Sequence, residues 1–498
     1  MKLYKLFIVA LACFLLAGCS DWLDYTPKDK QTYEQQFGTK AGFRNAVTGV
    51  YNKLASSSLY GYNLSYGPLD VMGQMYVVPN TNSSNFELKN YTWTGVYGSS
   101  VLYAIWSSAY SVVLNANLVL GAAEEAKGTV LSEDEYKLIR GEMLAVRSFL
   151  HLDLLRLFGP IYANDPQGLS IPYNDGIEAT RRERMPADKL VSEKLLCDLN
   201  EAEELLAEVD PVIESGVLNT DGGEEGNWER YRQLRMNYYA TVLLKARAYT
   251  WIGDYDNALI EAQKITDSEK VEEFFPDVNP NRLLANSINP DRGFSTECLF
   301  GFYSNSINEI YLNTFSGALD ASVVLQPRKG YMNILFPVAS DYRRQSQWTG
   351  SLSSSGGEVD FIKYKGFTAN KDNPEFWATF YGLMRKTEAY YIAAECLLNK
   401  DLSKACDYLN KVLQARGVET LPSTTDATAL LKQIKMEYLR EFRGEGQIFY
   451  LLKRFQQEFG SWDYEPTDPD MNGAETLSWA SVVAAQRYLV PIPAEENY

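Results

Sequence analysis

The sequence of 498 residues is long enough for a large core and more than one lobe, and its hydrophobic share of 46% is typical of a globular protein. The formal net charge of −17 argues against nucleic acids and anionic lipid headgroups as partners, because such a field repels phosphate. Neutral or weakly charged ligands fit better, and the large number of tyrosines, 34, also favours such ligands.

The N-terminus predicts export. Two lysines precede an apolar run over residues 6–16, and a pair of small residues separates this run from Cys19. A charged start, about ten apolar residues and small residues at a cleavage site indicate a signal peptide over residues 1–18, too short to span a bilayer stably. Residues 16–19 also resemble the lipobox of bacterial lipoproteins, which implies a lipidated Cys19 and a lipidated tether over residues 19–38. The alternative is an ordinary signal peptide with an incidental cysteine.

Helical periodicity dominates the predicted N-terminal region, residues 39–228. Apolar residues recur three and four positions apart over 39–54, 101–127, 132–158 and 186–208.

The helix over 132–158 carries signals at both ends. Ser132 and Glu135 form a capping box, and Gly159-Pro160 is a typical helix terminator. By contrast, residues 61–100 are rich in Gly, Asn, Ser and Tyr and follow neither period, which predicts a long loop.

The predicted C-terminal region, residues 229–498, contains two segments that share a spacing of small residues. Ala246 and Ala258 are separated by the same twelve positions as Ala393 and Ala405. Small residues at such offsets let paired helices pack closely, as in tetratricopeptide repeats, and generic helical hairpins are the alternative.

Between these two segments, residues 267–375 form an irregular insert with a predicted strand at 297–303. Helices are expected again from Phe376 to about residue 459. The fold class that follows is mostly α, a scaffold of tetratricopeptide-like helical hairpins with a large, loop-rich lobe that carries short strands.

Few residues offer catalytic or cofactor chemistry. His151 is the single histidine and lies between leucines in a predicted helix, where packing or hydrogen bonding is the favoured interpretation. No nucleophile elbow or nucleotide-binding glycine motif occurs. Four cysteines remain in the mature chain beyond Cys19; they form no C-x-x-C pair and are expected to be buried free thiols. They are Cys197, Cys298, Cys396 and Cys406.

One segment resembles a calcium loop. Asp468, Asp470 and Asn472 alternate and are followed by a glycine, as the oxygen ligands of such a loop do. The twelfth position, however, is Trp479 instead of a bidentate glutamate, and a solvated turn explains the same residues. Calcium is therefore a weak candidate, and no other cofactor is expected.

Aromatic residues outside the predicted helices are the candidates for ligand binding, because exposed rings stack on sugar faces while neighbouring polar groups bond the hydroxyls. The alternative is that these rings fill the core of their own lobe. The candidates are Tyr76, Asn80, Trp93 and Tyr97 in the first loop, and Tyr303, Asn305, Tyr331 and Trp348 in the insert.

Several segments together resemble the SusD/RagB family of glycan-binding outer-membrane lipoproteins, and the resemblance spans essentially the whole mature chain. Besides the lipobox, its carriers are Trp106-x-x-x-Tyr110 with Asn115-x-Asn117, residues 142–149 with 157–159, residues 384–389 with 393–395, residues 437–442 and residues 488–493.

This resemblance implies about four tetratricopeptide-like pairs and a protein without enzymatic activity. It also implies a lipid-anchored position on the outer membrane, exposed at the cell surface, where the protein captures an oligosaccharide or polysaccharide for a SusC-like TonB-dependent transporter. Two alternatives stay open. A secreted glycoside hydrolase needs just two carboxylates, and the chain has 64 acidic residues; a lid of the same transporter type could also capture peptide.

Overall fold

The computed structural model describes residues 33–78, 85–178, 182–284, 290–320, 322–327, 332, 335–349, 359–366, 376–423, 425–456 and 487–494. In the first half of the chain its helices and strands are α2 (Tyr33–Phe37), α3 (Lys40–Leu54), α4 (Pro68–Met72), β1 (Tyr76–Val77), α5 (Asn85–Lys89), α6 (Val96–Ala126), α7 (Glu133–Phe158), β2 (Leu169–Pro172), β3 (Arg184–Pro186), α8 (Ala187–Leu190), the π-helical turn η2 (Val191–Leu195), α9 (Leu196–Val209), α10 (Val212–Ser215) and α11 (Gly223–Gly226). In the second half they are α12 (Tyr238–Ile252), α13 (Tyr255–Thr266), α14 (Glu269–Phe274), α15 (Pro280–Leu284), β4 (Cys298–Tyr303), α16 (Ile307–Ile310), the π-helical turn η6 (Tyr311–Phe315), β5 (Gln326–Pro327), α18 (Tyr342–Ser346), β6 (Phe380–Arg385), α19 (Lys386–Leu397), α20 (Leu402–Ala415), α21 (Ala427–Glu441) and α22 (Ile448–Phe455).

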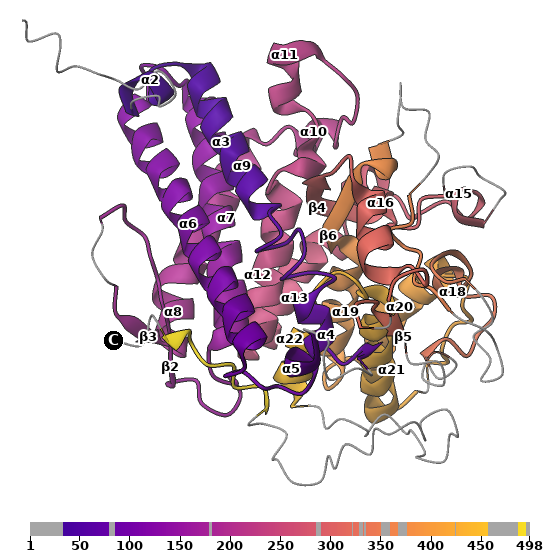
Figure 1. Ribbon diagram of the computed structural model, residues 1–498. Helices are drawn as coiled ribbons and strands as arrows, with labels where there is room; N and C mark the ends of the chain where they lie inside the picture. Colours follow the sequence, from indigo (N-terminus) through magenta and orange to yellow (C-terminus); the bar gives the residue numbers. More distant parts are fainter. Residues whose placement is uncertain are drawn as a thin grey trace, which may run out of the picture.

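Helical pairs form the scaffold. α3 packs against α6, α7 against α9, α12 against α13, and α19 against α20. Each pair contacts the next through α6 and α7, through α9 and α12, and through α13 and α19. In Figure 1 these helices run from the left of the view across its centre, while the short elements α15, α16 and α18 of the insert lie at the right. The predicted mostly helical fold with tetratricopeptide-like pairs is confirmed.

Local signals in the sequence explain where the first scaffold helices begin and which face they bury. The Thr39 side chain accepts a hydrogen bond from the Gly42 N–H at the start of α3, and the predicted apolar stripe of this helix is its buried face. Ser132 and Glu135 form the expected reciprocal capping box of α7, which ends at Gly159.

Small residues sit where neighbouring helices approach. Ala246, Ala258, Ala393 and Ala405 are all fully buried, as the shared spacing predicts. The turn between α12 and α13 is made by Gly253, whose φ of +79° is a conformation that a residue with a Cβ adopts only with strain.

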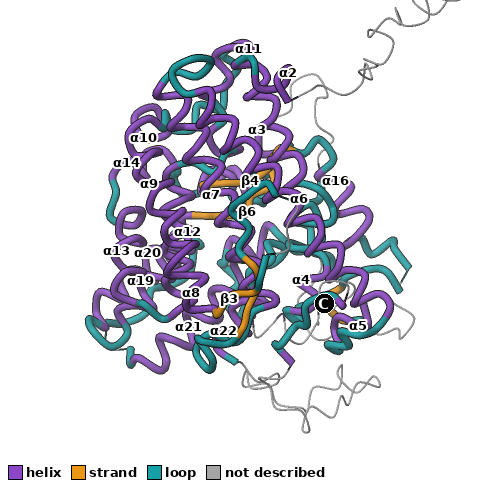
Figure 2. The backbone as a smooth tube through the Cα atoms, turned by 90° about the vertical axis from the view of Figure 1, so that its left-hand side faces the viewer, coloured by secondary structure: helices purple, strands orange, loops and turns teal. Residues whose placement is uncertain are grey.

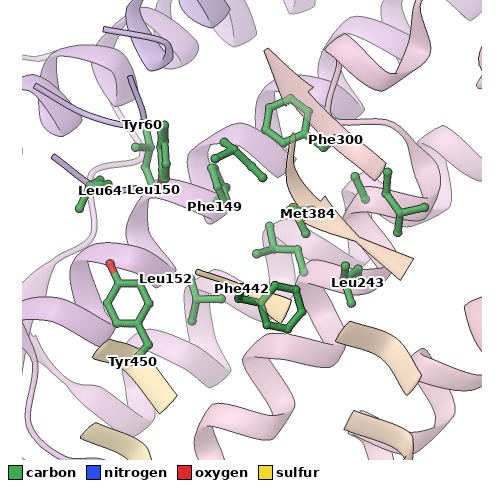
Figure 3. Close-up of a cluster of buried hydrophobic side chains, with 14 of the residues drawn as sticks. Tyr60, Leu64, Phe149, Leu150, Leu152, Leu243, Phe300, Met384, Phe442 and Tyr450 are labelled. Carbon is green, nitrogen blue, oxygen red and sulfur yellow. The ribbon is translucent and has the colours of Figure 1, made fainter. Parts of the chain in front are cut away.

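A two-stranded ribbon joins the insert to the scaffold. β4 pairs antiparallel with β6, and Tyr303 at the end of β4 lies opposite Phe380. Figure 3 shows Phe300 of β4 and Met384 of β6 among buried side chains of the helices, and the Phe300 ring lies 6.0 Å from that of Phe149 of α7. The ribbon therefore fixes the end of β4 relative to the helices. Figure 2 shows it from the side, with helices packed around it.

A buried charge cluster, centred on Glu441 at the end of α21, holds the insert on the scaffold as well. Glu441 accepts hydrogen bonds from Arg416, Arg343 and Arg385. Around these three arginines lie further buried charges, which are Glu297, Asp341, Lys363, Glu437 and Glu445. Burial alone would raise the pKa of Glu441, but the three guanidinium groups hold it well below its ordinary value.

Helix α6 is long and apolar enough to cross a membrane by length and composition alone, as no other helix among the described residues is. It contacts α3, α5 and α7, and half of its most apolar stretch is buried inside the protein. α6 therefore packs as part of the helical scaffold.

Three expectations about local structure are wrong. Residues 61–100 are not one long loop, because α4, β1, α5 and the first turn of α6 lie within them. Their order depends on tertiary contacts, such as the Gly444 N–H that donates to the Asp70 carboxylate over 2.6 Å. The chain resumes after the insert with strand β6, before helix α19. Cys197 is exposed, whereas the other three free cysteines are buried.

Candidate functional site

A cavity of about 470 Å³ lies between the segment that follows α3, the end of β4 and the α16–η6 segment. We call it the tyrosine cavity. Its lining residues are Ala55, Ser57, Gly61, Tyr62, Tyr66, Phe302, Tyr303, Ser304, Ser306, Glu309, Ile310, Asn313, Thr314 and Tyr381. β4 and α16, which supply two of its sides, are labelled right of the centre of Figure 1.

The side contributed by residues 55–66 is fixed by hydrogen bonds to α7 and within the segment. The Tyr60 hydroxyl donates to Asp153 of α7 over 2.8 Å, and its ring stacks on Phe149. The Tyr66 hydroxyl donates to the Gly61 carbonyl over 2.5 Å. This segment is therefore a fixed part of the core that presents its outer edge to the cavity.

Two tyrosines form the floor of the cavity and two form its rim. Tyr66 and Tyr381 are buried, with ring centroids 6.0 Å apart, and the Tyr381 hydroxyl donates to the Gly444 carbonyl. Tyr62 is half-buried, whereas 57% of Tyr303 is exposed. Tyr303 and, to a smaller extent, Tyr62 are therefore the tyrosines of the lining that a ligand can reach.

The hydroxyls of Tyr62, Tyr66 and Tyr381 stay protonated at neutral pH. Burial raises the pKa of Tyr66 to about 12 and that of Tyr381 further. Burial also raises the pKa of Tyr62, and the neighbouring Tyr97 and Tyr66 add to this rise.

Small polar side chains complete the lining. Ser57, Ser306 and Asn313 can each exchange hydrogen bonds with a ligand hydroxyl. Glu309 is the single carboxylate among the described lining residues, and it accepts a long hydrogen bond of 3.4 Å from the Asn313 amide. Rings beside a few convergent polar groups are the usual composition of a small-ligand site, and the volume lies in the common range of about 300 to 1,000 Å³.

Part of the predicted ligand-binding set lies at or near this cavity. Tyr303 is on its rim, and Asn305 is exposed two residues further on. Trp93 and Tyr97 are not among the lining residues; both are half-buried and pack against the core, and the Trp93 ring lies 5.1 Å from that of Tyr91.

Tyr76 and Trp348 are corrections, because both rings belong to the core. Only 1% of Tyr76 is exposed, and its hydroxyl donates to the buried Asp70. Trp348 is 6% exposed, lies against Phe361 with 4.7 Å between ring centroids, and is covered by the Arg443 guanidinium. Tyr76 pairs with Pro327 and Trp348 bridges Phe361, and the composition of the surrounding segments does not reveal these strand contacts.

The remaining predicted site residues lie outside the part of the chain that the structure describes. They are Asn80, Tyr331, the lipidation residue Cys19 and the calcium candidates Asp468, Asp470 and Asn472. Within the described residues, no group of three or more His, Cys, Asp or Glu side chains is arranged to hold a metal ion.

Sequence reasoning missed Tyr62, Tyr66, Glu309 and Asn313. A signal for the first two exists, since Tyr60, Tyr62 and Tyr66 crowd a stretch rich in Gly, Asn and Ser. Glu309 and Asn313 carry no comparable signal, because the α16–η6 segment is too short for a helical period.

His151 acts in the core, as expected. It is fully buried, accepts a hydrogen bond from the Asn174 N–H, bonds the Arg147 carbonyl through its other nitrogen, and stacks on Tyr173. Burial lowers the pKa of His151 to about 4, so the ring is neutral at physiological pH.

Two family models match different parts of the chain. One, described as the SusD family, matches residues 359–498, and the other, described as starch-binding associating with outer membrane, matches residues 21–213. A curated SusD-like protein P25 of Formosa agariphila is 24% identical over 170 residues, a match that spans 32% of this chain and 32% of that relative.

Solved structures share the fold along nearly the whole chain. A SusD superfamily protein of Bacteroides thetaiotaomicron is 21% identical with a TM-score of 0.66, covering 92% of this chain and 97% of that one. The surface glycan-binding protein A of the same organism, solved with laminarihexaose, is 18% identical with a TM-score of 0.65 and the same coverages of 92% and 97%. With family models matching at both ends and this fold between them, the chain belongs to the SusD/RagB family.

Proposed function

We propose that this protein is a cell-surface lipoprotein that binds carbohydrate at the tyrosine cavity and delivers it to a SusC-like TonB-dependent transporter of the outer membrane. The observation that carries the proposal is the cavity itself, an open site of about 470 Å³ with aromatic rings at its rim and hydroxyl groups, an amide and a single carboxylate around them. Membership of the SusD/RagB family and the glycan-bound relative support the same ligand class.

The chemistry of the lining suits a sugar. A pyranose ring presents a flat C–H face, which packs on an aromatic ring, and a perimeter of hydroxyls, which need both donors and acceptors. Tyr62 and Tyr303 supply the ring faces, and Ser57 and Asn313 supply groups that donate as well as accept. Because the rim is open to solvent and buries little ligand area, we expect dissociation constants in the micromolar range or weaker.

The direct test is a glycan screen with the purified protein, followed by titration of the best ligand against two tyrosine variants. Tyr303→Ala removes an exposed rim ring and should weaken binding by roughly tenfold or more, the effect of losing one stacking platform. Tyr33→Ala is the matched control, because Tyr33 is 45% exposed but lies on α2, outside the cavity lining. Equal affinity for the wild type and Tyr303→Ala would refute the assignment of the site.

Catalysis is tested separately from binding. Glycoside hydrolysis requires two carboxylates about 5 to 10 Å apart, and Glu309 is the one carboxylate among the described lining residues. We therefore expect no reducing sugar to be released from glycans that bind. Sustained turnover would replace the binding function with the glycosidase alternative.

Anchoring and partner are proposed from the N-terminus and the family. Cys19→Ala should release the protein from the membrane fraction, because acyl chains replace a spanning helix. Co-purification of a TonB-dependent transporter with the lipidated protein would support delivery. A flat glycan screen combined with successful co-purification would instead indicate a lid that binds the transporter alone.

A further inference from the structure

We infer that the tyrosine cavity selects uncharged glycans and rejects uronic-acid and sulfated chains, with Glu309 as the residue that sets this selectivity. The inference rests on the proposed function, because it names the substrate class of the same site. It follows from the one acidic residue, and from the lack of basic residues, among the described lining residues.

The lining carries a negative charge without a compensating cation. Among the described lining residues there is no lysine, arginine or histidine, and Glu309 is the single acidic residue. A site built for a carboxylate or sulfate would present arginine or lysine, since these groups recognise such anions by charge-assisted hydrogen bonds. The cavity offers the opposite charge pattern.

The surroundings do not reverse this pattern. Lys365 approaches the α16–η6 segment, and its ammonium lies 5.2 Å from the centroid of the Tyr311 ring. The same tyrosine donates to the Asp360 carboxylate over 2.9 Å, so an acidic residue as well as a basic one contacts Tyr311. The net charge of −17 on the whole chain adds repulsion toward an anionic polymer.

The position of Glu309 suits hydrogen bonding to the hydroxyl groups of a sugar. It lies on α16 at the cavity wall, it forms no ion pair with another described residue, and its hydrogen bond with Asn313 is a long contact of 3.4 Å. A carboxylate of this kind can accept hydrogen bonds from two neighbouring hydroxyls of a sugar. The same carboxylate would face a like charge if the sugar carried a carboxylate or sulfate, and like charges in close contact weaken association strongly.

The experiment uses matched pairs of oligosaccharides that differ in charge. Neutral gluco-, manno- and galacto-oligosaccharides are titrated into the purified protein by calorimetry, each beside its C6-carboxylated counterpart. The wild type should bind at least one neutral member, and its carboxylated partner at least roughly tenfold more weakly at low salt. Glu309→Lys should shrink this ratio or reverse it, and Glu309→Gln should have an intermediate effect.

A glutamate outside the cavity provides the control. Glu193 is exposed in η2, so Glu193→Lys changes the net charge equally and should leave the ratio unchanged. Equal or tighter binding of a carboxylated chain by the wild type would overturn the inference while preserving the proposed function. An unaltered ratio in Glu309→Lys would overturn it as well. If no member of any pair binds, the proposed function itself fails and the inference falls with it.

Discussion

Replacing Glu441 by glutamine should destabilise the fold more than any exposed charge substitution. The wild-type carboxylate is fully buried and accepts hydrogen bonds from Arg416 at 2.5 Å, Arg343 at 2.8 Å and Arg385. Glutamine keeps the shape of the side chain, but it removes the charge and turns an N–H group toward guanidinium donors. The three arginines then share less negative charge in a site that water does not reach.

The size of the effect depends on the carboxylates that remain beside the three arginines. Each arginine retains another carboxylate, since Arg416 also pairs with Glu297, Arg385 with Glu445 and Arg343 with Asp341. Removing one partner from a buried ion pair typically costs about 3 to 5 kcal/mol, and the retained partners place this substitution near the lower end, at about 3 kcal/mol. A loss of this size is a large fraction of the roughly 5 to 15 kcal/mol that stabilises a typical domain.

Urea unfolding followed by tryptophan fluorescence measures this free energy, with Glu208→Gln as control, because Glu208 pairs with Lys137 at the surface. The arginines lower the pKa of Glu441 below its ordinary 4.5, so its contribution is complete above that pH and is lost as the pH falls toward the folded-state pKa. The variant should lack this acid-dependent component. A change in unfolding free energy below about 1 kcal/mol at pH 7 would refute the argument that the cluster holds the insert in place.

Three further substitutions probe other parts of the structure. Burial lowers the pKa of His151 to about 4 from its ordinary 6.5, so the unfolded chain takes up this proton at a higher pH than the folded protein does. The free energy of unfolding should therefore fall by about 3 kcal/mol between pH 6.5 and 4. Urea titrations at the two pH values should show that His151→Phe lacks this pH-dependent loss. Gly253→Ala should lower the unfolding free energy by about 1 kcal/mol, because alanine is strained at a φ of +79°, and an unchanged midpoint would contradict this. Trp348→Ala should cost about 3 to 5 kcal/mol of stability through the cavity it leaves, while glycan affinity of the folded variant stays that of the wild type.

The parts of the fold that local signals determine could be read from the sequence. α3 buries the stripe that its spacing predicts, and α7 starts and stops at its capping box and its glycine. The strand predicted at 297–303 appears as β4, Cys298–Tyr303. In each case residues within a few positions of one another supply the decisive interaction, so the pattern is visible without knowledge of the rest of the chain.

The order of residues 61–100 could not be read in this way, because distant residues impose it. The Asp70 carboxylate accepts a hydrogen bond from the Gly444 N–H, 374 positions away in sequence, and β1 pairs with β5 of the insert. The prediction of Tyr76 as a surface ring is wrong for the same reason, since its burial depends on a strand partner that lies far along the chain. Tertiary contact, and not local propensity, decides between loop and core here.

The candidate site likewise contains residues that the sequence identifies and residues that it does not. Tyr303 could be found because it ends a recognisable strand, whereas Tyr62 and Glu309 come from segments with no periodic signal. The segments that carry the family resemblance contain mainly structural residues, such as Arg385 and Glu441 of the buried charge cluster. A buried charge must be matched by specific partners, and this requirement leaves a recognisable pattern. A rim tyrosine needs only an open position beside a cavity, so the resemblance identifies the scaffold, while the ligand must be argued from the shape and charge of the cavity.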